Sequence, residues 1–349
     1  MTSDNASGRW IAAGTTIVAA AIDLVYGAQA SLIVPLVFGP FVASALASVR
    51  DTVTVAVAAT LFGILLGWTD QTIGTSPHVV RVASVAIGGT LAVWLASRRT
   101  AREHKLLVMT RVAQVAQQAI LRPLPDEIRG IRLAARYVSA SEEAQIGGDF
   151  YEALETPWGV RLVVGDVRGK GLDAVRLASV LLGEFRSRAF SEPDLTAVVK
   201  AVDDAGRRAV DQGGEDFATA VFVQLEGALA TIVRCGQPLP LLAQSQEVHP
   251  IETVPSLPLC LGTDPVAQEV HLGTGSRMLL YSDGAIEGRD ERGDYFDLQS
   301  SYERHVGAPE PGTVLEAILD DLDRHCDGGI SDDVVLVIAE QPFVRRAEQ

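Results

Sequence analysis

The sequence Ile146-Gly147-Gly148-Asp149-Phe150-Tyr151-Glu152 places an aspartate between a pair of glycines and the first aromatic residue of an apolar run. Glycine has no Cβ, so a glycine pair lets the backbone approach a site that other residues would block. Taken alone, an aspartate in this position is most often a turn or cap residue. Its meaning depends on whether other acidic residues stand at similar places along the chain.

Three more acidic positions repeat the pattern at expected strand ends. Asp166 closes the run RLVVGD, Asp283 lies near the end of MLLYSDG, and the pair Asp332-Asp333 opens the last apolar run, DDVVLV. If these ends converge, their carboxylates build an oxygen-rich pocket of the kind that hard divalent cations require. The set is harder to explain as turns than any one member. Spacing alone nevertheless leaves both alternatives, a metal site and separate turns, open.

Short apolar runs divided by Gly and Asp dominate the chain after residue 130. The alternating segments TAVFVQL and LATIVRC, joined by EGA, predict a β-hairpin. Helical periodicity interrupts the strands at three places, Leu172 to Phe190, Leu195 to Val210, and Val314 to Arg324. Strands grouped around a few helices predict an α+β sandwich rather than an alternating βαβ sheet.

The first hundred residues differ from the rest in being strongly apolar. The chain has 349 residues and is 48% hydrophobic, yet only five Lys/Arg and four Asp/Glu precede residue 100. Four apolar stretches stand there, each of about 16 to 18 residues, near the short end of what a membrane-crossing helix needs. They are Trp10 to Tyr26, Ser31 to Ala47, Val53 to Trp68, and Val79 to Ala96. We therefore expect an integral membrane region of about four helices, with two or three as the alternative. A signal peptide is the alternative for the first stretch.

Arginines set an expected orientation for this region. Arg9, Arg50 and the basic cluster within 98–105 flank three of its loops and ends, whereas the other two connections carry no Lys or Arg. The positive-inside rule then places both termini in the cytoplasm. Arg81, near the start of the fourth stretch, counts against this and would have to extend to the outer interface. We expect a multi-pass cell-membrane protein with its C-terminal half in the cytoplasm.

A polar segment, Ser97 to Leu121, connects the two halves. It contains no Gly or Pro and ends before Pro123, where a helix should stop. A stripe repeats in steps of four and three, as one face of a helix does, at Val108, Val112, Val115 and Ala119. Either this helix pairs with a second copy of the chain, giving a homodimer that transmits a signal, or the stripe packs on its own domain.

Charge and cysteine content exclude several classes of function. Of the 29 basic and 44 acidic residues, 24 and 40 follow residue 100, so that part has a net charge of −16. Such a charge repels nucleic acid, and no nucleic-acid partner is expected. Cys235, Cys260 and Cys326 form no CxxC and no Cys-x5-Arg loop. This spacing argues against a zinc knuckle, a disulfide framework and a cysteine-dependent phosphatase.

Seven sequence blocks follow one another between about Ala119 and Glu340. They are IGGDFYEAL, VVGDVRGKGLDAVRLAS, FATAVFVQLE, CGQPLPLL, LPLCLG, LLYSDGAIEGRDERGDYFD and SDDVVLVIAE. Each block alone is weak. In this order and spacing they resemble the SpoIIE/RsbU-type serine/threonine phosphatases of the PPM (protein phosphatase 2C-like) superfamily. The resemblance implies an αββα sandwich, in which two antiparallel sheets have helices on their outer faces.

The resemblance also implies a two-metal centre of Mn2+ or Mg2+. Its ligands would be Asp149, Asp166, the Val167 carbonyl, Asp283 and Asp332, with Asp333 as the alternative to Asp332. Two such ions activate a water and clamp the phosphoryl oxygens, so that hydroxide attacks phosphorus without a covalent enzyme intermediate. The four carboxylates at Asp149, Asp166, Asp283 and Asp332 are then the catalytic residues, and no Cys, Ser or His nucleophile is required.

Three departures from the family pattern leave these ligands in place. The family often has YD where this chain has Tyr151-Glu152, GH where it has Gly236-Gln237, and Ser or Thr near Arg168. The changes at Arg168 and Gln237 bear on substrate choice or rate. For the loop GKG at 169–171 we expect a structural role, and attraction of substrate phosphate by Lys170 is the alternative.

The opening stretch also resembles, at first sight, the GGDEF signature of diguanylate cyclases. That signature has a further acidic residue, whereas Phe150 follows Asp149 directly. A cyclase would also leave Asp166, Asp283 and Asp332 without a role, and we set this interpretation aside.

The expected protein is a membrane-anchored, metal-dependent phosphoserine/phosphothreonine protein phosphatase. By the resemblance, its substrate is a phosphorylated anti-sigma-factor antagonist of the STAS type in bacterial partner switching. The alternatives are a catalytically silent scaffold that binds a phosphoprotein, and a transporter regulated by its phosphatase half. The expected boundaries are a membrane region at 1–97, a connector helix at 98–122, the phosphatase domain at 123–342 and a tail at 343–349.

Overall fold

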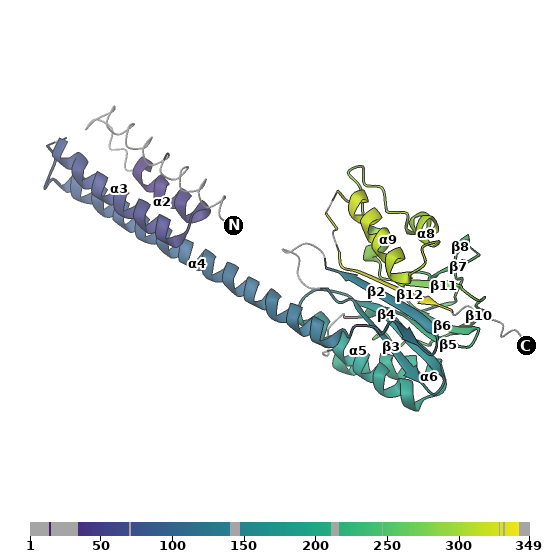
Figure 1. Cartoon of the computed structure of the whole chain (residues 1–349). Coiled ribbons are helices and arrows are strands. Elements are labelled where there is room, and N and C mark those ends of the chain that lie inside the picture. The colour runs from purple at the N-terminus through teal and green to yellow at the C-terminus, as the bar shows by residue number, and fades with distance from the viewer. Residues whose placement is uncertain are drawn as a thin grey trace, which may run out of the picture. The chain divides into compact units, whose positions relative to one another are not determined.

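Two units make up the chain, Met1–Met109 and Thr110–Gln349, and each is described by itself (Figure 1). The computed structural model describes residues 14, 34–69, 71–139, 147–210, 216–245, 247–327, 329–330 and 332–341.

The first unit contains α2 (Val34–Leu46), α3 (Val49–Thr69) and the start of α4 (Ser76–Ile120). Small residues let these helices approach closely, since a Cβ added to Gly89 of α4 would lie 3.0 Å from the Cβ of Ala56 in α3. Arg99 of α4 donates to the backbone carbonyls of Ala45 and Ala47 at the end of α2, the second at 2.7 Å. These bonds satisfy carbonyls that a helix end leaves without an intrahelical partner.

Within the described residues, two helical segments are long and apolar enough to cross a membrane, Val49–Trp68 and Ser76–Lys105. They correspond to the third and fourth predicted spans. The second predicted span, Ser31 to Ala47, is described only from Val34 onward, and its described part forms the 13-residue α2. The first, Trp10 to Tyr26, lies outside the described residues apart from Gly14. Among the described residues the structure therefore supports two candidate spans, and the four-helix prediction is supported only in that part.

The fourth predicted stretch and the predicted connector form one continuous helix. α4 has 45 residues and ends at Ile120, three residues before Pro123, as the proline predicts. The side chains of residues 111–120 are not described, so the choice between a homodimer stripe and packing on the chain's own domain stays a prediction.

The second unit contains two sheets. Sheet A has the strand order β1-β2-β12-β11-β7-β8 and sheet B the order β10-β6-β5-β4-β3, with β9 paired to β6. The strands are β1 (Glu127–Ile128), β2 (Ile131–Val138), β3 (Phe150–Thr156), β4 (Gly159–Val167), β5 (Ala218–Glu226), β6 (Leu229–Cys235), β7 (Leu241–Gln244), β8 (Glu247–Pro250), β9 (Pro255–Ser256), β10 (Ala267–His271), β11 (Arg277–Tyr281) and β12 (Val334–Glu340).

Helices cover the outer face of each sheet. They are α5 (Leu172–Ser191) and α6 (Leu195–Ala209) on sheet B, and α8 (Leu298–His305) and α9 (Pro311–His325) on sheet A, with the short α7 (Gly284–Glu287) after β11. Figure 1 shows the teal pair α5 and α6 beside β3 to β6, and the yellow-green pair α8 and α9 on the other side of the two sheets. The predicted αββα sandwich and its three predicted helices are confirmed.

Alternation along the central strands explains this layering. In β12, Val335 and Val337 pack between the two sheets, while Leu336 and Ile338 pack against α8 and α9. Because successive side chains in a strand point to opposite faces, a strand covered on both faces must be apolar throughout. All seven residues of β12 are buried, so its run VVLVIAE can only be a central strand.

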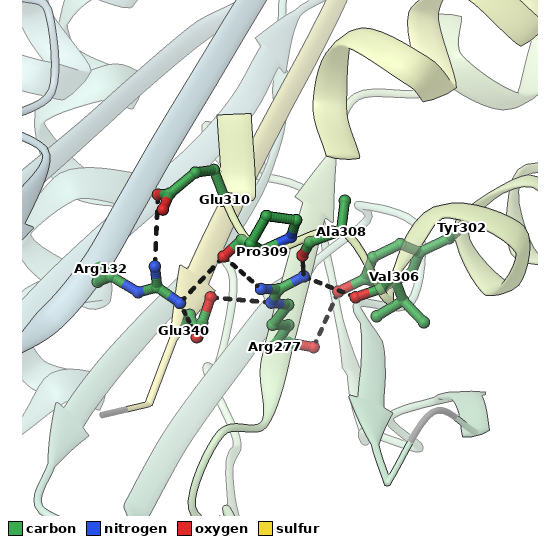
Figure 2. A network of polar contacts seen from close by, with 8 residues as sticks. All are labelled: Arg132, Arg277, Tyr302, Val306, Ala308, Pro309, Glu310 and Glu340. Carbon is green, nitrogen blue, oxygen red and sulfur yellow. Dashed lines mark hydrogen bonds and ion pairs between the residues drawn. The ribbon is translucent and has the colours of Figure 1, made fainter. Parts of the chain in front are cut away.

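A buried ion-pair network fixes the connection between α8 and α9 to sheet A (Figure 2). Arg277 of β11 pairs with Glu340 of β12 at 2.8 Å through its Nε, and its Nη1 donates to the carbonyls of Val306 and Ala308, both at 2.6 Å. Arg132 of β2 also pairs with Glu340. Glu340 is 1% exposed, so the network provides the positive partners that a buried carboxylate requires.

Candidate metal centre

Antiparallel pairing brings the predicted carboxylates to one place. The end of β11 and the start of β12, with Asp283 and Asp332, meet at one end of sheet A. The start of β3 and the end of β4, with Asp149 and Asp166, meet at one end of sheet B. These ends share a cavity of about 80 Å³. It is lined by Gly147, Gly148, Asp149, Asp166, Gly169, Lys170, Asp283, Asp332 and Asp333.

Asp149 is held from the opposite sheet. Its carboxylate is 3% exposed and accepts a 2.9 Å hydrogen bond from the Ser282 hydroxyl. Ser282 is itself fixed to β12, because its backbone N–H donates to the Val335 carbonyl at 3.0 Å and its Oγ accepts from the Val335 N–H at 2.9 Å. Burial, followed by the negative charge of Asp166, raises the pKa of Asp149 well above its ordinary value. One serine thus aligns a carboxylate of sheet B with a strand of sheet A.

Asp166 is the next-to-last residue of β4. Burial raises its pKa to about 7, and the charge of Asp283 contributes in the same direction. The following residue, Val167, lies against the glycine pair, since a Cβ added to Gly148 would be 2.3 Å from the Val167 carbonyl oxygen. Only glycine fits there, which explains why the motif needs a glycine directly before Asp149.

Asp283 stands at the N-terminal end of α7. Its backbone carbonyl accepts hydrogen bonds from the N–H groups of Ile286 and Glu287, at 2.8 and 2.9 Å. Burial raises the pKa of Asp283, and the charge of Asp332 adds to this effect. A Cβ at Gly284 would lie 2.0 Å from the Asp333 carbonyl oxygen, so the glycine of the sequence SDG lets this turn pack against the last strand.

The neighbouring residues Asp332 and Asp333 have different surroundings. Asp333 is 4% exposed and accepts hydrogen bonds from the Gly147 N–H at 3.0 Å, from the Ser139 hydroxyl at 3.3 Å and from the Tyr137 hydroxyl. Asp332 is 44% exposed and pairs with Lys170 at 2.9 Å. Asp333 therefore fastens the glycine pair to sheet A, whereas Asp332 faces the only cationic side chain among the residues that line the cavity.

The residues that depart from the family pattern fill other roles. Glu152 is buried and pairs with Arg186 of α5. Gln237 is also buried and donates to the Tyr281 carbonyl at 2.9 Å. Arg168 is exposed, with its guanidinium 5.3 Å from the centre of the Phe217 ring. Arg168 is thus the departure that stands at the surface beside the cavity.

The donor chemistry of the cavity suits hard divalent cations. Five carboxylates and one lysine line a small space, where burial, followed by the repulsion between the carboxylates, raises the pKa values of Asp149, Asp166 and Asp283. Protons or bound cations relieve such repulsion, and oxygen ligands are those that Mg2+ and Mn2+ prefer. No group of three His, Cys, Asp or Glu side chains among the described residues is already arranged to hold an ion.

Sequence reasoning missed three residues of this site. Ser282, Tyr137 and Ser139 hold Asp149 or Asp333 in place. Ser282 could have been noticed because it directly precedes Asp283 in YSDG, but nothing in the sequence pairs it with Asp149.

A larger cavity, of about 690 Å³, lies between β2 and the start of α9 and includes none of the predicted ligands.

Comparison with known proteins agrees with this geometry. The family model of stage II sporulation protein E (SpoIIE) matches residues 156–342, a stretch that includes Asp166, Asp283 and Asp332 and begins just after Asp149. The structure of the RsbU and RsbW domains of a Mycobacterium tuberculosis protein is 24% identical, with a TM-score of 0.55. That match covers 64% of this chain and only 63% of the other.

Two further solved structures are similar to this chain. The SiaA-PP2C domain of Pseudomonas aeruginosa is 18% identical, with a TM-score of 0.57, and the match covers 70% of this chain and 99% of that domain. The catalytic domain of the serine/threonine phosphatase PstP, in complex with two manganese ions, is 19% identical, with a TM-score of 0.47 and coverage of 60% and 97%. Since the SpoIIE model spans more than half of the sequence and the sandwich fold agrees with it, this chain belongs to the SpoIIE family of PPM-type, metal-dependent phosphatases.

Proposed function

We propose that this protein hydrolyses phosphoserine or phosphothreonine on a regulatory protein, with two Mn2+ or Mg2+ ions held in the cavity of about 80 Å³. The observation that carries the proposal is the convergence of Asp149, Asp166, Asp283 and Asp332 from two different sheets on that cavity. A purely structural explanation would require four acidic turn residues to meet there by accident, although each raises the electrostatic energy of the others.

The proposed ligands follow from the placement of each group. Asp149, Asp166 and the Val167 carbonyl come from sheet B, and Asp283 and Asp332 come from sheet A. We choose Asp332 over Asp333 because Asp333 already accepts three hydrogen bonds from the protein. This choice gives Asp333 the role of holding the Gly147-Gly148 segment that leads into Asp149.

The chain's own residues bind and orient the reactants. When bound, the two ions supply an activated water and neutralise the phosphoryl oxygens. Lys170 adds a positive charge at the cavity and so favours entry of a phosphate dianion into a domain of high negative charge. Cysteine chemistry does not compete, because burial raises the pKa of Cys235 and of Cys260 to about 12 and neither thiol lines the cavity.

We further propose that the protein is attached to a membrane by its apolar helices. Val49–Trp68 and Ser76–Lys105 satisfy the length and composition of membrane spans. Arg50 stands at the start of the first, and the basic cluster of residues 98–105 stands at the end of the second. In a helical pair these two ends lie on the same side, and the bonds from Arg99 to the end of α2 bring them together. The positive-inside rule then places this side, and the phosphatase domain that follows, in the cytoplasm.

The proposed substrate is a phosphorylated anti-sigma-factor antagonist of the STAS type. Membership of the SpoIIE family and the resemblance of the seven sequence blocks to SpoIIE/RsbU-type phosphatases support this choice. Removal of the phosphate would let the antagonist bind its anti-sigma partner and so release a sigma factor.

The test is phosphate release by the full-length chain in detergent, with a phosphoserine protein as substrate. We expect Mn2+-dependent release that disappears in Asp166→Asn and in Asp283→Asn. Asp323→Asn is the matched control, because Asp323 is exposed on α9 and does not line the cavity. A folded wild-type chain that binds phosphoprotein and Mn2+ but releases no phosphate would overturn the proposal and favour a scaffold.

A further inference from the structure

Gln237 is a buried polar side chain that joins the two sheets. It is 1% exposed and stands in the connection between β6 of sheet B and β7 of sheet A. The preceding residue, Gly236, forms a bridge with Ala220 of β5, so this part of the connection belongs to sheet B. The side-chain Nε2 of Gln237 donates to the carbonyl of Tyr281 at 2.9 Å. Since Tyr281 is the last residue of β11, the glutamine reaches from one sheet to the other.

The carbonyl that accepts this bond lies where β11 has lost its neighbouring strand on one side. The last pair between β7 and β11 is Leu241 with Leu279, so Tyr281 stands two residues beyond it. The next residue, Ser282, donates its N–H to β12. Because successive residues of an antiparallel strand direct their backbone groups to opposite sides, the Tyr281 carbonyl points to the β7 side. Gln237 supplies there the donor that a strand residue would otherwise provide.

The backbone of Gln237 is itself held in place by Arg234 of β6. Nη1 of Arg234 donates to the Gln237 carbonyl at 3.0 Å, and its Nε donates to the Thr253 hydroxyl at 2.8 Å. A glutamine with a fixed backbone and a buried side chain has few conformations open to it. Its bond to Tyr281 therefore has a defined length and direction, as positioning of a functional site requires.

The other atom of the amide group argues against a role in stability alone. Among the residues that the structure describes, Oε1 of Gln237 is a buried atom with no hydrogen-bond partner. A buried carbonyl oxygen without a donor typically costs as much free energy as one neutral hydrogen bond contributes. The amide group thus adds little net stability to the fold, and the place of its one bond is what distinguishes it.

That place is the start of the turn that carries the candidate ligands. Ser282 follows Tyr281 directly and holds the carboxylate of Asp149, and Asp283 comes next and lines the cavity. We infer that Gln237 is a positioning residue of the metal centre, which fixes the peptide from which Ser282 and Asp283 project. It thereby aligns a carboxylate of sheet B with one of sheet A. The inference rests on the proposed phosphatase function and adds a residue that does not itself line the cavity.

The departure from the family pattern at this position fits such a role. The family often has GH where this chain has Gly236-Gln237. An imidazole can also donate one N–H to a carbonyl, so a histidine at this position is able to make the same bond. The change then replaces the group and keeps the donor.

The test measures Mn2+ binding to the full-length chain in detergent by isothermal titration calorimetry, with no substrate present. Gln237→Met nearly keeps the shape of the side chain and removes its donor. Partners that orient a metal ligand are worth about 10- to 100-fold in affinity, and we expect a loss of about 10-fold because Gln237 acts through one intervening peptide. Gln237→His restores a donor and should recover most of the affinity.

Gln341→Met is the matched control. Gln341 is also buried, at 7% exposed, and its Nε2 donates to the Gly227 carbonyl at the same distance of 2.9 Å. It follows the end of β12, whereas Asp332 and Asp333 precede the start of that strand, so its bond lies away from the cavity. Gln341→Met should keep the wild-type affinity for Mn2+. Urea unfolding of both variants in EDTA measures how much stability each one loses.

A double variant separates positioning from a general loss of stability. Gln237 and Ser282 fix the same turn, so their contributions to Mn2+ affinity depend on each other. The loss in Gln237→Met combined with Ser282→Ala should be smaller than the product of the two single losses. Gln341→Met combined with Ser282→Ala should show the full product, as independent sites do.

Equal Mn2+ affinity in wild type and Gln237→Met would overturn the inference, and so would an equal loss of affinity in Gln341→Met. A loss that Gln237→His does not reduce would overturn it as well, because disturbed packing and not the missing donor would then be the cause. A wild-type chain that binds no Mn2+ contradicts the proposed function itself, and the inference fails with it. A wild-type chain that binds two ions, with Gln237→Met binding them as tightly, contradicts the inference alone.

Discussion

The hydroxyl of Ser282 donates a 2.9 Å hydrogen bond to the carboxylate of Asp149, although 133 positions separate the two residues. Ser282 follows β11 in sheet A, and Asp149 precedes β3 in sheet B. The bond therefore joins the two sheets at the cavity. Ser282 is also bonded twice to Val335 of β12, so it is fixed to sheet A. A shift of one sheet against the other would therefore break the link through Ser282 and move Asp149 relative to Asp283.

This bond predicts that Ser282→Ala weakens metal binding. Partners that orient a metal ligand are typically worth about 10- to 100-fold in affinity, and we expect a loss in that range for Mn2+, measured by isothermal titration calorimetry. Ser282→Thr keeps the hydroxyl and should restore most of the affinity. Equal Mn2+ affinity in wild type and Ser282→Ala would show that the hydroxyl does not orient Asp149.

The different surroundings of Asp332 and Asp333 predict different losses on substitution. Asp332→Ala should remove one of two bound Mn2+ ions and abolish phosphate release while leaving the melting temperature of the metal-free protein nearly unchanged. Asp333→Ala should lower that melting temperature, because it removes the acceptor of three hydrogen bonds, of which the buried one from the Gly147 N–H is worth about 1 to 3 kcal/mol. Metal stoichiometry and thermal unfolding, measured on both variants, check the pair. Loss of an ion in Asp333→Ala alone would reverse the assignment.

The network around Arg277 predicts a large effect on stability and little direct effect on chemistry. Arg277→Ala leaves Glu340 with Arg132 as its remaining cationic partner and removes the donors to the Val306 and Ala308 carbonyls. Breaking a buried ion pair in this way typically costs about 3 to 5 kcal/mol. Urea unfolding of the full-length chain measures this loss. A variant with wild-type stability would show that the network does not hold the connection between α8 and α9.

The buried carboxyls predict an unusual dependence of stability on pH. Burial raises the pKa of Asp166 to about 7, against about 3.9 for an unfolded aspartate. Between these values the folded state binds more protons than the unfolded state, so the free energy of unfolding increases as the pH falls. EDTA-treated protein should therefore be more stable at pH 5 than at pH 7 in urea unfolding. Asp166→Asn should flatten this dependence, and an unaltered slope in that variant would contradict the prediction.

Asp321 makes the free energy of unfolding depend on pH in the opposite direction, but in another pH range. Although burial alone would raise the pKa of Asp321, hydrogen bonds from Arg304, Ser301, His305 and Arg324 hold it well below its usual value. A lowered pKa contributes stability that is present above the unfolded pKa and is lost as the pH falls below about 4. The measurement between pH 5 and pH 7 is thus free of this effect.

Much of the phosphatase domain could be predicted because its strands and helices have strong local signals. The apolar run of β12 and the periodicity of α5, α6 and α9 predicted these elements, and acidic residues at expected strand ends predicted the candidate site, whose carboxylates line one cavity. α8 was missed because its sequence, LQSSYERH, has little apolar periodicity. Its burial depends on Leu298 and Tyr302 meeting sheet A, a contact that no local pattern reveals.

The other limits of the sequence were contacts between distant residues and the length of helices. Asp332 and Asp333 are adjacent residues of the same type, so the sequence cannot distinguish their roles, and only their hydrogen bonds do. The bond from Ser282 to Asp149 depends on how two sheets stack. In the membrane region, hydropathy marked apolar stretches, but hydropathy does not set where a helix begins, and α3 begins at Val49 rather than at the predicted Val53.

The most direct test of the two-metal phosphatase is the rate of phosphate release as a function of free Mn2+, measured on full-length protein first stripped with EDTA. We expect no phosphate release without metal and full recovery of the rate once about two ions are bound per chain. Asp166→Asn should not recover at any Mn2+ concentration. Release that persists in EDTA, or a wild-type chain that binds two ions and leaves phosphoserine intact, would contradict it.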